Sequence, residues 1–136
     1  MNLARGYIFS RPFMGERVPQ HIQNQVIRDY CKRNQLEFLL SSTEYAMPDC
    51  HLMLEQVLGN LHTVSGVVAY SLFQLPEAQA KRQEIYEQFI NKKKFLHFAL
   101  EGIKASSRKD CERIEMLWSV RLTLPYCPQT QDIKYS

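Results

Sequence analysis

The sequence has no apolar run that approaches the roughly 20 residues of a membrane-spanning helix. Its first residues, 1–5, run directly into a predicted strand, so we expect no signal peptide. Internal repeats, low-complexity segments and signs of a second domain are also absent. These absences exclude membrane-spanning and repeat proteins. We therefore expect a cytoplasmic protein without a membrane partner.

The sequence also lacks the patterns of metal and disulfide chemistry. Its four cysteines are scattered without a C-x-x-C pair, and its four histidines show no spacing typical of metal ligands. We therefore expect no metal site and no cofactor. Cys31 and Cys111 fall on the apolar faces of predicted helices, where a thiol packs as a small core residue.

Charge of one sign is only in slight excess. The net charge is +3 over 136 residues, which permits an anionic ligand but is too mild for a dedicated nucleic-acid binder. We expect no nucleic-acid partner. The length and a hydrophobic fraction of 45% are sufficient for one domain with its own core. We place this domain at residues 1–125, followed by a polar tail at 126–136.

Short runs rich in β-forming residues alternate with segments of helical periodicity along the whole chain. The run at 66–71 is almost continuously apolar, which is typical of a strand buried on both faces of a parallel sheet. The last helix begins with a capping box formed by Ser107 and Asp110. The predicted strands lie at 6–10, 37–41, 66–71 and 95–100, and the predicted helices begin at 20, 48, 77 and 107.

This alternation predicts an α/β fold in the form of a three-layer sandwich. Its central sheet has four parallel strands joined by right-handed crossovers, in the order 2-1-3-4. The carboxyl ends of parallel strands form the edge where such folds bind ligands, next to the point at which the strand order reverses. We therefore expect the functional site in the polar loops that follow the strands.

The stretch 6–20 is the best candidate for carrying that chemistry, because a short strand ends there in Ser10-Arg11-Pro12 and a loop and a helix follow. Ser10 is a candidate nucleophile. The alternative is that Ser10 is a hydrogen-bonding turn residue, which is common for a serine at the end of a strand.

Two arginines of the same loop are candidates for binding an anion. Arg11 and Arg17 could hold a phosphate or carboxylate with paired hydrogen bonds. Alternatively, they pair with Glu16 or Glu44 and order the loop. Gln20 lies in the first turn of the following helix, whose free N–H groups attract anions, and this favours the ligand.

The loops after the other strands add polar side chains to the same edge. Glu44 and Tyr45 follow the second strand, Ser71 and Gln74 follow the third, and Glu101 follows the fourth. A partly buried glutamate at such a site could act as a general acid or base, whereas a solvated one would only face water. The candidate catalytic residues are therefore Ser10, Glu44 and Glu101, and the candidate ligand-binding residues are Arg11, Arg17, Gln20, Tyr45, Ser71 and Gln74.

The last predicted helix carries more apolar side chains than one sheet needs to cover. Leu117, Trp118 and Leu122 spread over a broad face of it. A small domain with such a surplus commonly buries it against a second copy, so we expect a homodimer.

The order of these elements resembles the catalytic domain of the serine recombinases, the resolvases and invertases, within the broader flavodoxin-like class. The residues that carry this resemblance are Gly6-Tyr7…Ser10, the glutamine-led helix with Ile27 and Cys31, and the Val-Val strand. That family has an arginine two residues before its nucleophilic serine and an Asp-Arg-x-x-Arg motif after its third strand. Here the Asp-Arg-x-x-Arg motif is replaced by Phe73-Gln74-Leu75-Pro76-Glu77. The residue two places before Ser10 is Ile8 and not an arginine. The resemblance implies the fold without recombination.

A second resemblance covers roughly residues 6–125. The strings GYIFSRPFMGERVPQ, EYAMP and AYSLFQLP are similar to those of the sporadic carbohydrate cluster proteins. That family is encoded among genes for lipopolysaccharide and other surface-polysaccharide synthesis. The resemblance implies a pathway and does not assign a reaction to any residue.

Two functions follow as hypotheses. In the first, a small protein binds or acts on an anionic sugar, a sugar phosphate or a nucleotide sugar at the carboxyl edge of the sheet. In the second, a recombinase-like fold that has lost its chemistry is a non-catalytic partner of another enzyme of the pathway. Buried carboxylates in a closed pocket would favour the first, and a flat apolar patch around Leu117 and Trp118 would favour the second.

Overall fold

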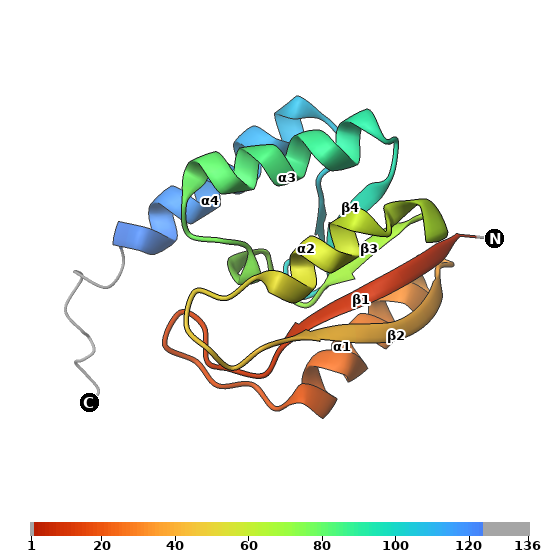
Figure 1. Cartoon of the computed structure of the whole chain (residues 1–136), viewed down its shortest axis with the longest axis horizontal. Coiled ribbons are helices and arrows are strands. Elements are labelled where there is room, and N and C mark those ends of the chain that lie inside the picture. The colour runs from red at the N-terminus through yellow and green to blue at the C-terminus, as the bar shows by residue number, and fades with distance from the viewer. Residues whose placement is uncertain (1, 124–136) are drawn as a thin grey trace.

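A five-stranded sheet lies between helices in the computed structural model, which describes residues 2–123 (Figure 1). The predicted tail at 126–136 and the predicted domain end at 125 lie outside the described residues. No helix within 2–123 is long and apolar enough to cross a membrane. The elements are β1 (Leu3–Phe9), α1 (Gln20–Arg33), β2 (Glu37–Glu44), α2 (Leu52–Gly59), η1 (Leu61–Thr63), β3 (Gly66–Ala69), η2 (Leu72–Gln74), α3 (Gln79–Asn91), β4 (Phe95–Phe98), β5 (Ile103–Lys104) and α4 (Arg108–Thr123).

The strand order is β2-β1-β3-β4-β5, and the first four strands are parallel, which confirms the predicted α/β class and the order 2-1-3-4. The fifth strand was not predicted. It pairs antiparallel with β4 through His97–Lys104 and Phe98–Ile103. Two residues are too few to show the alternation that marks a strand in a sequence, so only the fold reveals it.

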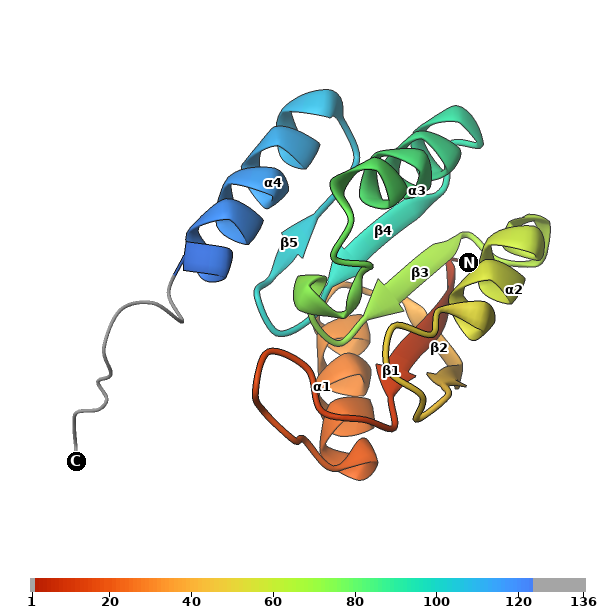
Figure 2. The same ribbon diagram turned by 60° about the vertical axis from the view of Figure 1, so that its left-hand side comes forward.

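The layers on the two faces of the sheet are unequal. Helix α1 covers one face, and α2, α3 and α4 cover the other (Figures 1 and 2). The chain moves one way across the sheet from β1 to β2 and the opposite way from β2 through β4, so crossovers of one hand place α1 and α2 on opposite faces. Side chains of β1 alternate accordingly: Ala4 and Ile8 pack toward α1, and Tyr7 and Phe9 pack toward the larger layer.

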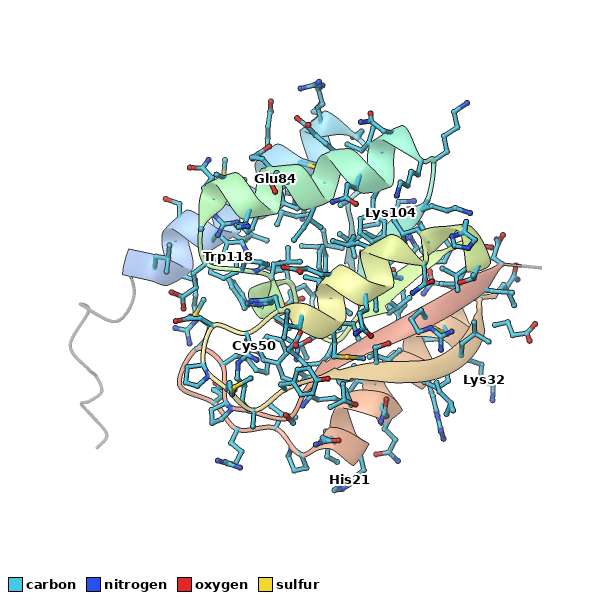
Figure 3. All side chains as sticks on the ribbon, viewed as in Figure 1. His21, Lys32, Cys50, Glu84, Lys104 and Trp118 are labelled. Carbon is cyan, nitrogen blue, oxygen red and sulfur yellow. The ribbon has the colours of Figure 1, made fainter. Side chains whose placement is uncertain are left out.

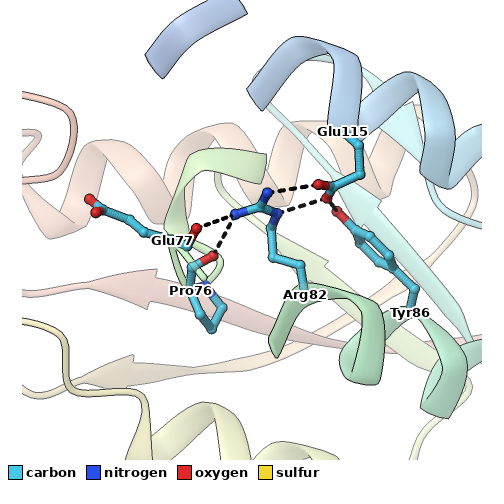
Figure 4. A network of polar contacts seen from close by, with 5 residues as sticks. All are labelled: Pro76, Glu77, Arg82, Tyr86 and Glu115. Carbon is cyan, nitrogen blue, oxygen red and sulfur yellow. Dashed lines mark hydrogen bonds and ion pairs between the residues drawn. The ribbon is translucent and has the colours of Figure 1, made fainter. Parts of the chain in front are cut away.

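A buried ion pair joins α3 to α4 (Figure 4). The guanidinium of Arg82 donates two hydrogen bonds of 2.7 Å to the Glu115 carboxylate, and the Tyr86 hydroxyl donates a third. Arg82 also donates to the carbonyls of Pro76 and Glu77, so it fixes the chain just before α3 as well. Because removal of one member leaves a buried charge unpaired, such a pair is costly to break, by about 3–5 kcal/mol.

Trp118 is completely buried, so it fills the core of this chain and is not part of the apolar surplus predicted for the last helix. Its ring lies inside the molecule (Figure 3), 5.2 Å from the ring of Phe73 and 4.3 Å from the guanidinium carbon of Arg82. Leu117 is half-buried against the same core, and only Leu122 of the three is exposed. The exposed apolar side chains of α4 are Met116, Val120 and Leu122, and the homodimer stays a prediction.

The start of α4 keeps half of the predicted capping box. The Asp110 N–H donates to the Ser107 hydroxyl over 3.3 Å, as the motif requires. The Asp110 carboxylate, however, accepts from the N–H and the hydroxyl of Ser106 instead of turning back to Ser107. Hydrogen bonds from Ser106 hold the pKa of Asp110 below its usual value.

Candidate ligand site at the carboxyl edge of the sheet

The loop between β1 and α1 closes on itself at its tip. Phe13 and Glu16 exchange two backbone hydrogen bonds of 2.9 Å around Met14 and Gly15. Both central residues have positive φ, 50° and 76°, which is the geometry of a two-residue type I′ turn. Arg121 of α4 donates to the Met14 carbonyl over 2.7 Å and fixes the tip in place.

Gln23 holds the base of the same loop. Its side-chain amide exchanges two hydrogen bonds with the backbone of Phe9, of 3.0 and 2.9 Å, and donates another to the Val18 carbonyl. Sequence reasoning did not single it out. The signal was present, because Gln23 stands one turn before Ile27 on the buried stripe of α1, and a polar residue there needs partners inside the protein.

Gln74, a predicted ligand-binding residue, extends this scaffold. It is fully buried, and its amide nitrogen donates to Gln23 Oε1 over 2.8 Å. Its own side-chain oxygen has no partner among the described residues. If the Gln74 amide were turned over, its oxygen would face the Gln23 oxygen, which is also an acceptor. In the observed orientation the Gln74 oxygen therefore has no donor among the described residues.

Ser10, the candidate nucleophile, donates its hydroxyl to the Glu44 carbonyl over 2.6 Å. Within the described residues it has no hydrogen bond to a carboxylate or an imidazole that could remove its proton. This geometry is that of the alternative interpretation, a serine that closes a turn at the end of β1.

Glu44 is almost completely buried at the end of β2, and the donors around it occupy both of its carboxylate oxygens. Burial alone would raise its pKa, but the hydrogen bonds outweigh burial and lower the pKa below the usual value. Two of the donors are N–H groups in the first turn of α2, so the Glu44 carboxylate caps that helix. The donors are the Tyr7 hydroxyl at 2.8 Å, the N–H groups of Met53, Leu54 and Tyr45 at 3.1–3.2 Å, and the Cys50 thiol at 3.7 Å.

Glu101 has fewer partners than Glu44. It accepts from the Ser71 hydroxyl over 2.7 Å and from the Leu72 N–H over 3.0 Å, while the Ser71 oxygen accepts from the Phe73 N–H. Burial raises the pKa of Glu101 in spite of these bonds. The pair of side chains caps η2 and lines a hollow of about 330 Å³ beneath α4.

Arg11 is held flat at the edge of the sheet. Its guanidinium carbon lies 4.1 Å from the centroid of the Phe9 ring, and one N–H donates to the Tyr45 carbonyl over 2.7 Å. Within the described residues it forms no ion pair, so the alternative of pairing with Glu16 or Glu44 is not what orders the loop. Its other N–H groups have no protein partner there.

The three remaining predicted residues lie away from the hollows of this edge. Arg17 is exposed and makes no hydrogen bond or ion pair within the part of the chain that the structure describes. Gln20 is exposed at the first residue of α1, and Tyr45 keeps 47% of its surface in solvent. None of the three residues lines the hollow beside Ser71 and Glu101 or a second hollow at the same edge, which contains Arg11.

A hollow of about 250 Å³, here called the edge hollow, lies where the loops after β1, β2 and β3 meet. Arg11 is the only predicted residue in its lining. Ser71 and Glu101 line the neighbouring hollow instead, and Phe13, Met14 and Phe73 line both. The lining of the edge hollow consists of Phe9, Arg11, Pro12, Phe13, Met14, Ala46, Pro48, Asp49, His51, Phe73, Leu75 and Glu77.

His51 is the residue of the edge hollow that sequence reasoning missed. Its ring lies 5.9 Å from the ring of Phe9, and Nε2 is 3.3 Å from the Gln74 carbonyl. Burial, and then the charge of Arg11, lower the pKa of His51, so the ring is neutral at pH 7. No spacing motif marks it, because its neighbours in space come from other loops.

The edge hollow thus combines one cation, one neutral imidazole and the carboxylates of Asp49 and Glu77. The described residues contain no group of three His, Cys, Asp or Glu placed to hold a metal ion. A guanidinium with free N–H groups binds an anion, and carboxylates accept hydrogen bonds from hydroxyls. The edge hollow, whose Arg11, Asp49 and Glu77 carry a net charge of −1, therefore offers one group for an anion and two acceptors for hydroxyls.

Comparison with solved structures supports the fold. The N-terminal catalytic domain of TP901-1 integrase superposes with a TM-score of 0.63 at 14% sequence identity, over 90% of this chain and 98% of that domain. A resolvase family site-specific recombinase from Streptococcus pneumoniae gives 0.58 at 14% identity, over 96% and 93%. At this identity the likeness is one of fold, which confirms the predicted recombinase-like architecture. The sequence matches no family model and no curated protein.

Proposed function

We propose that this chain is a cytoplasmic protein of a surface-polysaccharide pathway that binds a small anionic sugar in the edge hollow. The pathway rests on the resemblance of three strings to the sporadic carbohydrate cluster proteins. The observation that carries the proposal is the place of those strings: residues 6–20, 44–48 and 69–76 each run from the end of a different strand into the connection that follows it, and all three connections supply walls of the edge hollow.

The fold alone does not require such loops to match a family, because strands and helices tolerate many loop sequences. The first string supplies Arg11 and Phe13, the second Pro48, and the third Phe73 and Leu75.

The lining selects a ligand with one anionic group and several hydroxyls. Arg11 offers its free N–H groups to a phosphate or carboxylate, while Asp49 and Glu77 accept from hydroxyls. Phe13 and Phe73 provide apolar surface for the carbon face of a sugar ring. The volume of about 250 Å³ is below the range of roughly 300–1,000 Å³ that drug-sized ligands occupy, so a single sugar acid or sugar phosphate fits better than a nucleotide sugar.

The geometry favours binding over catalysis. Ser10, Glu44 and Glu101 each make a hydrogen bond to backbone groups of neighbouring loops. None of the three lines the edge hollow. A reaction in the edge hollow would therefore need an acid, a base and a nucleophile other than these three residues.

Calorimetry with a panel of hexose phosphates, hexuronic acids and nucleotide sugars tests this function. Replacing Arg11 by alanine should weaken binding by about 1.5–3 kcal/mol, the value of a charge-assisted hydrogen bond. Arg17→Ala is the matched control, because it removes the same charge from the same loop outside the hollow.

The proposal requires that the wild type binds at least one monosaccharide of the panel below millimolar concentration. It is overturned if none binds, or if Arg17→Ala weakens binding as much as Arg11→Ala. The remaining function is then the non-catalytic partner of another enzyme of the pathway.

A further inference from the structure

A groove of about 510 Å³ runs between α2 and α3, beside the edge hollow. Leu54 and Leu58 of α2 and Ile85 of α3 form its floor with 3%, 7% and 5% of their surfaces exposed, and the more exposed Pro76 and Ala78 add apolar atoms beside them. Figure 1 shows the two helices side by side on the same face of the sheet. A partner side chain entering between them would contact these three residues.

The charges around the groove are opposite in sign to the whole chain. Four carboxylates, those of Asp49, Glu55, Glu77 and Glu84, line it together with one cation, Lys81. The groove therefore carries a charge of −3, whereas the chain as a whole carries +3. None of these five side chains forms an ion pair within the described residues.

The Glu77 carboxylate is an example of a groove charge without an ion-pair partner among the described residues. Its backbone carbonyl accepts from Arg82, but Figure 4 shows its side chain directed away from that guanidinium. The guanidinium of Arg82 forms its ion pair with Glu115 instead. The groove thus keeps its negative charge although a buried arginine lies close by.

We propose that this groove docks a basic segment of a partner protein, in which lysines or arginines flank an apolar side chain. The apolar side chain would lie on Leu54, Leu58 and Ile85, and the flanking cations would meet the carboxylates of the rim. Charge complementarity of this kind selects the partner and accelerates encounter, and it weakens as salt is added. The groove shares Asp49, His51 and Glu77 with the edge hollow, so the partner would lie next to the sugar site.

The test uses a short labelled peptide in which leucines are flanked by lysines. The fluorescence anisotropy of this peptide is measured while the whole chain is added, at low and at high salt. The double variant Glu55→Gln/Glu84→Gln should weaken binding by about fivefold, as the loss of two exposed ion pairs implies. Glu37→Gln/Glu87→Gln is the matched control, since it removes two exposed carboxylates outside the groove, one of them from α3 itself.

Two further peptides separate the contributions of charge and apolar contact. A peptide with glutamate in place of lysine should not bind, and one with serine in place of leucine should bind several-fold more weakly. The proposal is overturned if no peptide binds, if both double variants weaken binding equally, or if the serine peptide binds as well as the leucine peptide. Sugar binding is measured on the same variants and should not change, so failure here and failure of the proposed function are distinguishable.

Discussion

At the residue scale, buried polar side chains organise the carboxyl edge of the sheet. Gln23 donates to the backbone of β1, Glu44 accepts from an N–H group of α2, and Glu101 accepts from an N–H group of η2. The sequence placed Glu44 and Glu101 at this edge, because each follows a predicted strand. It could not show what they contact, because α2 and η2 approach them only in the folded chain.

The cap formed by Glu44 gives a prediction for stability and its pH dependence. Its folded pKa is lower than the ordinary value of 4.5, so the carboxylate stabilises the fold above that pH, and this contribution is lost as pH falls through the folded pKa. Glu44→Gln should lower the free energy of unfolding by about 1–3 kcal/mol at pH 7, because the amide cannot accept from all of the donors. Urea unfolding at pH 7 and pH 3 measures this.

The difference between wild type and Glu44→Gln should be smaller at pH 3 than at pH 7, because the contribution of the ionised carboxylate decreases as the pH falls below 4.5. Glu55→Gln is the control, since this exposed carboxylate lies in the first turn of the same helix without a hydrogen-bond partner among the described residues. It should cost only about 0.3–1 kcal/mol through the helix dipole. Equal losses for the two variants, or a difference that is unchanged at pH 3, would contradict the role of Glu44.

At the element scale, periodicity was sufficient for the parallel strands and the four helices. It failed for the short elements, because β5 and the turn at Met14-Gly15 contain too few residues to show a period. It also placed the start of α2 at residue 48, whereas the helix begins at Leu52. Pro48 lies in the middle of the loop between β2 and α2, and the carboxylate of Glu44 fixes where the helix starts.

The close pairing of β3 with β4 gives a prediction at this scale. Gly66 lies opposite Phe95, and a Cβ at this position would collide with both the ring and the carbonyl of Phe95. Gly66→Ala should destabilise the protein by about 1–3 kcal/mol, as overpacking does. Gly59→Ala at the end of α2 meets open space and should be neutral or stabilising by up to about 1 kcal/mol. If thermal unfolding ranks the two variants the other way, the β3–β4 pairing is wrong.

At the scale of the whole molecule, the fold is similar to that of recombinase domains. A fold positions loops at one edge of a sheet, and the loops decide the chemistry. The sequence located this edge and one residue of the edge hollow, Arg11. It missed His51 and the division of the edge into two hollows, because both depend on how Phe13 and Phe73 pack.

The hydrogen-bonded Ser10 gives a further prediction at this scale. DNA strand exchange needs several guanidinium groups around the developing charge, and Phe73, Gln74 and Glu77 supply none. Ser10→Ala should therefore leave sugar binding within about twofold and cost only about 0.5–1.5 kcal/mol of stability, the value of one neutral hydrogen bond. Incubation with plasmid DNA, followed by denaturing electrophoresis, should show no adduct. A covalent link between Ser10 and DNA would refute this expectation.

The central claim, that an anionic sugar occupies the edge hollow, is tested most directly by the imidazole NMR signals of the four histidines. His51 lines the hollow, His21 and His62 are exposed elsewhere, and His97 lies in β4 beside Tyr30. On addition of a hexose phosphate or hexuronic acid, the signal of His51 should move and its pKa should rise toward 6.5 or above, because a nearby anion favours the charged ring. The other three signals should stay in place. Saturable movement of another histidine while His51 is unchanged, or no movement at millimolar sugar, would contradict the account.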